Sequence, residues 1–157
     1  MTSQPPIQQP EQRSLDAVIV GAGFGGLCTA IKLREAGIEN FVILEKFGEV
    51  GGTWRDNTYP GAACDVQSHL YSFSFAGKPD WNYRYGGQQE IRDYIENTTD
   101  EYGIRPFIRF NQEVNGAHFD EQRGVWTLTT ENGDVYTTRH FVLATGPLHE
   151  PSYPNIP

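Results

Sequence analysis

In the early part of the chain, two short apolar runs flank a segment whose apolar residues recur at helical spacing. Residues 15–20 and 40–45 have the composition of strands that are buried on both faces of a sheet. Between them, residues 24–36 carry apolar side chains at helical spacing, and Gly37 ends this pattern. The strand–helix–strand order predicts one right-handed βαβ unit with two parallel strands.

The middle of the chain contains two different patterns. Residues 46–87 are rich in glycine and proline and show no long periodic stretch. They predict a functional loop, because loops of this length inside a compact domain usually have a function. Residues 88–102 are amphipathic at helical spacing and predict a helix that Gly103 ends. A short strand is predicted at 107–110.

The last part of the chain reads as β structure. Segments 114–119, 125–130 and 135–138 are separated by glycine turns and predict a three-stranded antiparallel meander. Residues 140–144 predict a last buried strand. The predicted fold class is therefore α/β: a three-layer, Rossmann-like domain with the meander inserted before its last strand.

A glycine fingerprint stands at the end of the first predicted strand. Gly21 allows a tight turn, Gly23 lets the backbone approach a pyrophosphate, and Gly26 lets the helix lie close to the strand. The helix that starts near Phe24 points its free N–H groups at that pyrophosphate. Glu45 ends the second strand, where a carboxylate accepts ribose hydroxyls and disfavours a 2′-phosphate. This context favours an NAD- or FAD-like ligand over the alternative of a simple glycine-rich turn.

Composition and charge narrow the function classes. The 157 residues are enough for one domain, and the net charge of −8 without a lysine or arginine cluster argues against nucleic acid and anionic membranes as partners. No apolar run approaches the ~20 residues of a membrane span. Cys28 and Cys64 do not suggest a disulfide framework, and the four histidines lack metal-ligand spacing, so we expect a cytoplasmic protein without a metal site.

The domain boundaries follow from the same reading. Residues 1–13 are polar and rich in glutamine and proline, and we interpret them as a disordered tail and not as a secretory signal. Residues 14–149 form the expected FAD-binding domain. Residues 150–157 contain three prolines and no core pattern, which is typical of a linker.

Two further motifs favour FAD over NAD. Thr145 and Gly146 follow the last predicted strand, where small residues leave room for a cofactor beside the glycine turn. NAD dehydrogenases usually continue their sheet with βα units, whereas this chain inserts a meander. The paired glycines Gly51 and Gly52 can present bare backbone to phosphates.

A more specific stretch, YPGA-x-CD, lies at residues 59–65. Together with GAGFGG, GGTW and ATG, it closely resembles the N-terminal part of the Baeyer–Villiger monooxygenases, from about Asp16 to the end of the chain. These flavoproteins use FAD, NADPH and O₂ to convert ketones into esters or lactones. Related N-hydroxylating and flavin-containing monooxygenases share the glycine segments but generally lack this stretch.

The resemblance implies roles for individual residues. Gly21, Gly23 and Gly26 hold the pyrophosphate, and Glu45 holds the ribose. Asp65 is the implied catalytic residue, beside the flavin ring, where it positions an arginine; the alternative from the residues alone is a helix cap or a turn. The other implied cofactor-binding residues are Phe24, Lys46, Gly52, Thr53, Trp54, Arg55, Asp56, Tyr71, Val114, Thr145, Gly146 and Pro147.

The family also has a second glycine fingerprint for NADPH, and this feature has no counterpart in the chain. We therefore expect the FAD-binding portion of a monooxygenase, with NADPH bound mainly by other regions and with no activity in the isolated chain. The alternatives are a non-catalytic module for FAD or ADP and a fragment of an N-hydroxylating flavin monooxygenase.

Overall fold

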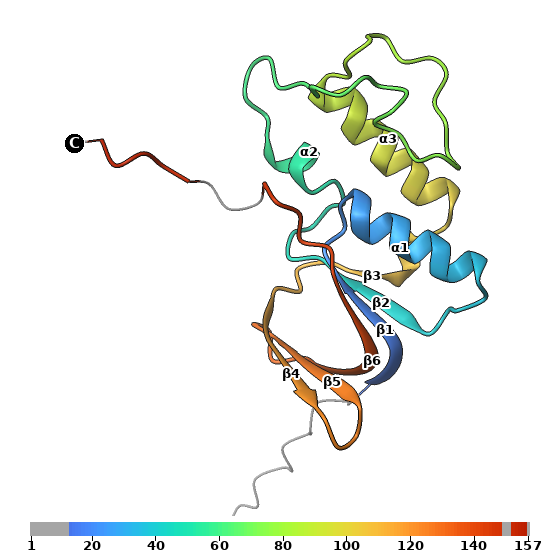
Figure 1. The fold of residues 1–157 in the computed structure, drawn as a ribbon, viewed down its shortest axis with the longest axis vertical. Coiled ribbons are helices and arrows are strands. Elements are labelled where there is room, and N and C mark those ends of the chain that lie inside the picture. The colour runs from blue at the N-terminus through green and yellow to red at the C-terminus, as the bar shows by residue number, and fades with distance from the viewer. Residues whose placement is uncertain (1–12, 149–151, 157) are drawn as a thin grey trace, which may run out of the picture.

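The computed structural model describes residues 13–148 and 152–156 (Figure 1). Six strands form one sheet in the order β3-β2-β1-β6-β5-β4. The strands are β1 (Arg13–Val20), β2 (Phe41–Leu44), β3 (Ile108–Arg109), β4 (Val114–Asp120), β5 (Val125–Thr130) and β6 (Val135–Leu143). The helices are α1 (Phe24–Glu35), α2 (Thr53–Asp56), α3 (Gln88–Glu101) and a 3₁₀ turn at Arg105–Phe107.

The predicted βαβ unit is confirmed. β1 pairs in parallel with β2, and α1 connects them. α1 ends at Glu35, and Gly37 follows in the left-handed region with a φ of +78°. Glycine adopts this conformation without a steric penalty, so the chain can turn back towards β2.

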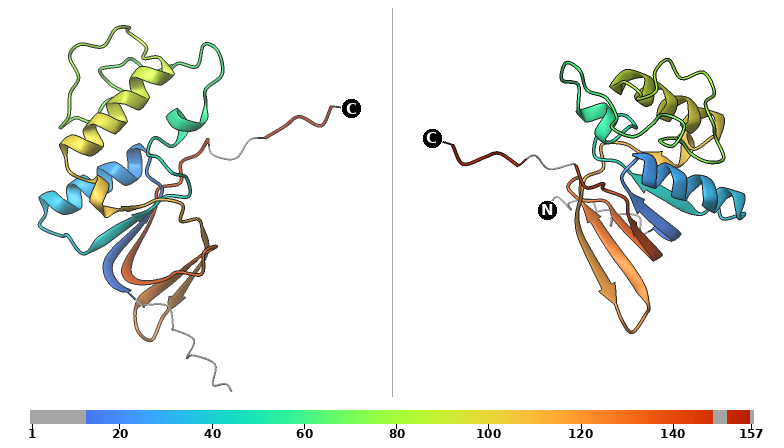
Figure 2. Two further views of the ribbon diagram at one scale, coloured as in Figure 1. Left: turned by 180° about the vertical axis from the view of Figure 1, so that it is seen from behind. Right: turned by 45° about the horizontal axis from the view of Figure 1, so that its top comes forward.

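The parallel strands are covered on both faces, which confirms the three layers of the predicted fold class. Successive side chains of a strand point to opposite faces. Ile19 packs in a core with Leu27 and Ile31 of α1, whereas Val18 packs in a second core with Leu128 of β5. Figures 1 and 2 show α1 and α3 on one side of the parallel strands and the β4–β5 hairpin on the other.

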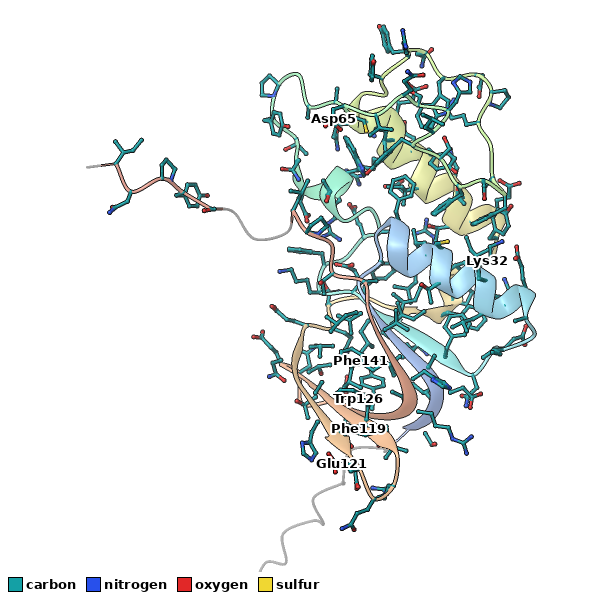
Figure 3. The ribbon with its side chains drawn as sticks, viewed as in Figure 1. Lys32, Asp65, Phe119, Glu121, Trp126 and Phe141 are labelled. Carbon is teal, nitrogen blue, oxygen red and sulfur yellow. The ribbon has the colours of Figure 1, made fainter. Side chains whose placement is uncertain are left out.

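A ladder of aromatic rings joins the meander to the parallel strands. Phe119 on β4 lies 5.1 Å from Trp126 on β5, and Trp126 lies 5.2 Å from Phe141 on β6, between ring centroids. Figure 3 shows the three rings in a row across the strands. Such cross-strand aromatic pairs stabilise a sheet and hold its register.

The prediction of separate strands at 135–138 and 140–144 is wrong, because both belong to the continuous strand β6. Its first residues pair antiparallel with β5, and the whole strand pairs in parallel with β1, from Tyr136 to Leu143. The second half is also not buried, since Leu143 is 68% exposed. α1 packs on β1 and β2, so this end of β6 lies at the margin of the helical layer.

Other boundaries differ in small ways. α3 ends at Glu101, and the predicted strand at 107–110 is reduced to β3 after a 3₁₀ turn that contains Pro106. The expected tail falls on residues 1–12, which lie outside the described residues, and on Arg13, which begins β1. The extent of the tail and of the linker stays a prediction. Within 13–148 and 152–156, no helix is both long and apolar enough to cross a bilayer.

The long segment after α2 is held against α3 by tyrosine hydroxyls. The Tyr94 hydroxyl accepts the Phe73 N–H at 2.9 Å and donates to the Ala76 carbonyl at 2.7 Å. The Tyr102 hydroxyl donates to the Phe75 carbonyl at 2.9 Å. Residues 73–76 of the predicted loop are thus fixed to the domain by hydrogen bonds.

We predict that Tyr94→Phe lowers the free energy of unfolding by about 1–3 kcal/mol, because it leaves the buried Phe73 N–H without its acceptor. Denaturation in urea measures this change. Tyr83→Phe is the matched control, since the Tyr83 side chain belongs to a residue that is 72% exposed. Equal stability of the two variants would contradict the anchoring role of Tyr94.

Candidate functional site

A cleft of about 590 Å³ lies at the carboxyl ends of β1, β2 and β6. Ligands of open α/β sheets bind at this edge. The first turn of α1, the start of α2 and the connection from β3 to β4 complete its walls. The predicted site residues that line it are Gly21, Gly23, Phe24, Glu45, Lys46, Gly52, Thr53, Trp54, Arg55, Tyr71, Val114, Thr145, Gly146 and Pro147.

Two glycines bring α1 close to the strands. A Cβ atom on Gly26 would lie 1.9 Å from the Gly21 carbonyl oxygen, and one on Gly21 would lie 2.5 Å from the Ala144 carbonyl oxygen. Gly21 also has a φ of +104°. The crossing of α1 over the end of β1 therefore tolerates no side chain at Gly26, and the close approach of the ends of β1 and β6 tolerates none at Gly21.

Two further glycines leave bare backbone at the floor of the cleft. Gly23 is the N-cap of α1, and a Cβ atom on it would lie 3.7 Å from the Gly52 Cα atom. Because Gly23 has no side chain to cap the helix, the first-turn N–H groups and the positive end of the helix dipole face this space. This arrangement suits an anion such as a pyrophosphate.

Glu45 is held rigidly at the next edge of the cleft. The residue is only 4% exposed, and its Oε2 atom accepts the Ala22 N–H at 2.8 Å. Its Oε1 atom accepts the Phe47 N–H at 3.0 Å and a hydrogen bond from Arg55 Nη1 at 2.9 Å. A buried carboxylate is stable only with such partners. Glu45 thus connects the end of β2 with the turn between β1 and α1 and with α2.

Arg55 is the cation of this network. Burial by itself would lower the pKa of Arg55, but hydrogen bonds and charges from Asp56 and Glu45 outweigh burial and raise that pKa above its ordinary value. The guanidinium also lies over the Phe47 ring, 4.2 Å from its centroid. Arg55 is therefore a fixed positive charge beside Glu45.

Three aromatic side chains that contact one another line part of the cleft. Trp54 Nε1 donates to the Tyr71 hydroxyl oxygen at 3.1 Å, and the Phe24 ring meets the Tyr71 ring edge-on at 5.1 Å. Burial raises the pKa of Tyr71, and the Trp54 hydrogen bond opposes this rise. The Tyr71 phenol stays neutral near pH 7, and its O–H remains able to donate to a ligand.

Three predicted site residues lie outside the cleft lining. Gly26 sits behind it in the helix–strand contact, and Asp56 pairs with Arg55. Asp65 is exposed in the segment that precedes α3, as Figure 3 shows, and its charge contributes to the raised pKa of Tyr71. The catalytic role of Asp65 stays a prediction.

The sequence reading missed the wall between β3 and β4. Gln112 and Glu113 line the cleft, and the Gln112 N–H donates to the Glu45 carbonyl at 2.9 Å. The signal that points to them is positional, because they follow a parallel strand at the same carboxyl edge. Gly51, which the sequence places with Gly52 near phosphates, also lines the cleft. The lining residues to which the sequence assigned no role are Val20, Ala22, Gly25, Leu44 and Ala144.

Comparison with known proteins identifies the family. A family profile described as pyridine nucleotide-disulphide oxidoreductase matches residues 18–157. The chain belongs to this family. The chain is 51% identical over 139 residues to a Baeyer-Villiger monooxygenase of Streptomyces coelicolor. This match covers 88% of the chain and 27% of that relative. It is also 43% identical over 144 residues to a Baeyer-Villiger monooxygenase of Pseudomonas aeruginosa, and this match covers 92% of the chain and 27% of that relative.

Solved structures agree with the fold. An oxidized steroid monooxygenase bound to NADP is 39% identical with a TM-score of 0.83, over 90% of this chain and 28% of that one. Cyclohexanone monooxygenase from Rhodococcus sp. Phi1 bound to NADP⁺ is 38% identical with a TM-score of 0.86, over 94% of this chain and 28% of that one. The resemblance to Baeyer–Villiger monooxygenases is confirmed, and this member of the oxidoreductase family spans about a quarter of these relatives' length.

The Gly26 contact generates a stability prediction. Gly26→Ala should lower the free energy of unfolding by about 1–3 kcal/mol, because the new methyl group overpacks the helix–strand contact. Gly25→Ala is the matched control, since its Cβ atom would meet only the Ala144 methyl group at an ordinary 3.7 Å. Urea denaturation of both variants measures the difference, and an unchanged Gly26→Ala midpoint would contradict the close approach of α1.

Proposed function

We propose that this chain is the FAD-binding portion of an NADPH- and O₂-dependent flavoprotein monooxygenase that oxidises ketones to esters or lactones. The observation that carries the proposal is the cleft. It combines bare glycine backbone at the α1 N-terminus with a rigid carboxylate at the end of β2. The names of the relatives supply the reaction class.

The residues of the cleft fit FAD at three places. The Gly23–Gly52 floor and the first turn of α1 would take the pyrophosphate. Glu45 would accept hydroxyl groups of the adenosine ribose. Tyr71 accepts a hydrogen bond from Trp54, so its own O–H is free to donate. This O–H would contact the flavin mononucleotide half of FAD.

The connection after β3 would receive the adenine. Val114 lines the cleft at the start of β4 and is proposed to contact the adenine through its backbone. Thr145, Gly146 and Pro147 follow β6 and also line the cleft, where they would close over the cofactor. When bound, FAD supplies hydride acceptance and oxygen activation, while this chain binds and orients it.

The monooxygenase reaction needs partners that the relatives' names suggest. Two of the solved relatives are bound to NADP, and a structure of cyclohexanone monooxygenase is bound to cyclohexanone. We accordingly propose NADPH, O₂ and a small ketone as partners of the full-length enzyme, which would act in the cytoplasm. The similarity to two Baeyer-Villiger monooxygenases favours this reaction over N-hydroxylation.

We expect FAD to bind the chain at least about tenfold more tightly than FMN, because FMN lacks the adenosine ribose that Glu45 would hold through charged hydrogen bonds. Calorimetric titration with each flavin measures the ratio. Equal affinity for FAD and FMN would contradict the assignment of Glu45 and of the adenosine half of the cleft.

Gly23→Val should abolish FAD binding in the same titration, because a branched side chain would fill the space between α1 and Gly52. Gly77→Val is the matched control. Gly77 lies outside the cleft lining, and a Cβ atom on it would meet nothing within 4 Å. Normal flavin affinity of Gly23→Val would overturn the pyrophosphate assignment.

The reaction itself is tested in the full-length enzyme that the proposal implies. We expect ketone-dependent NADPH consumption with formation of an ester or lactone, measured by absorbance and by product mass. Asp65→Ala should keep the flavin content and reduce product formation, as its proposed place beside the flavin requires. Hydroxylated amines as the only products would instead support the N-hydroxylase alternative.

A further inference from the structure

The Arg55 guanidinium is almost completely occupied by the protein itself. Its Nε and Nη2 atoms donate to the two carboxylate oxygens of Asp56 at 2.7 and 3.0 Å. Its Nη1 atom donates to Glu45 at 2.9 Å and to the Glu49 carbonyl at 2.7 Å. These bonds use nearly all N–H donors of a guanidinium. The Arg55 side chain is only 10% exposed.

This occupancy matters because of where Arg55 lies. An arginine near the acidic residue at the end of the second strand is the usual means of binding a 2′-phosphate on an adenosine ribose. Arg55 stands at that place and lines the cleft beside Glu45. Its charge also compensates that of Glu45, so repulsion by Glu45 alone is a weak barrier to a 2′-phosphate.

Asp56 reduces the attraction of Arg55 for a 2′-phosphate without lining the cleft itself. It takes the forked face of the guanidinium in a bidentate pair, the geometry that a phosphate would otherwise adopt. Asp56 itself lies outside the cleft lining. Asp56 therefore makes no direct contact with a nucleotide in the cleft, and its hydrogen bonds to Arg55 connect it to the ligand space.

We propose that Asp56 is a specificity-determining positioning residue. By holding the Arg55 guanidinium, it keeps this cation from a 2′-phosphate and lets the cleft select an unphosphorylated adenosine ribose. The inference rests on the proposed function, in which the cleft binds the ADP half of FAD. It explains how this site refuses a 2′-phosphorylated nucleotide such as NADPH, the proposed co-substrate.

The test compares ADP-ribose with its 2′-phosphorylated form by calorimetry on the 157-residue chain. In Asp56→Asn, the affinity ratio should shift towards the 2′-phosphorylated ligand by about tenfold, the effect of one charged hydrogen bond. ADP-ribose itself should bind within about threefold of the unchanged chain. Lys46 also lines the cleft, but it is present in every variant and cancels from the comparison.

Three variants isolate the cause. Asp56→Glu keeps a carboxylate and should keep the original ratio. The double variant Arg55→Gln/Asp56→Asn should lose the gain, because the freed cation is gone. Asp100→Asn is the matched control, since Asp100 makes the same bidentate pair with Arg105 on the exposed surface, at 2.5 and 2.9 Å.

The outcomes separate this inference from the proposed function. A ratio that stays within twofold in Asp56→Asn, while ADP-ribose binds, overturns the inference alone. A gain that persists in the double variant also overturns it, because Arg55 would then not be the cause. Failure of the unchanged chain to bind ADP-ribose overturns the proposed function together with the inference.

Discussion

The contact between α1 and the end of β1 is the constraint on which the rest of the structure depends. A single Cβ atom on Gly26 would lie 1.9 Å from the Gly21 carbonyl oxygen, so helix and strand meet backbone to backbone. This approach places the first turn of α1 at the carboxyl edge of the sheet. The partial positive charge of the helix end is then available to an anion in the cleft.

The second interaction that shapes the cleft is electrostatic and holds the Glu45 carboxylate in place. Glu45 is buried as a carboxylate because two backbone N–H groups and Arg55 supply the hydrogen bonds that water would otherwise give. The same bonds tie the end of β2 to α1 and α2. The acidic residue is therefore both a structural connection and the proposed ribose acceptor, and its surroundings determine which ribose it can accept.

The meander and the long segment before α3 complete the domain from opposite sides. The meander covers the second face of the parallel strands through Leu128 and the Trp126 ring ladder, which buries Val18. The segment after α2 supplies Tyr71 to the cleft and is anchored by Tyr94. Walls from distant parts of the sequence thus meet around one glycine turn, which is how this family of folds builds a ligand site from separate loops.

The sequence by itself determined the βαβ unit, the glycine turn and the position of Glu45, because each follows from the pattern of apolar residues and glycines along one continuous stretch of the chain, residues 15–45. It also indicated the aromatic and small residues of the cleft, through Tyr71 and Gly146. Only the tertiary structure decided that β6 is one strand, since its course depends on pairing with β1 and β5 at the same time. Only the tertiary structure likewise showed that Arg55 donates to both Glu45 and Asp56. These hydrogen bonds depend on how closely the backbone of α2 approaches the end of β2, and no local pattern in the sequence predicts that approach.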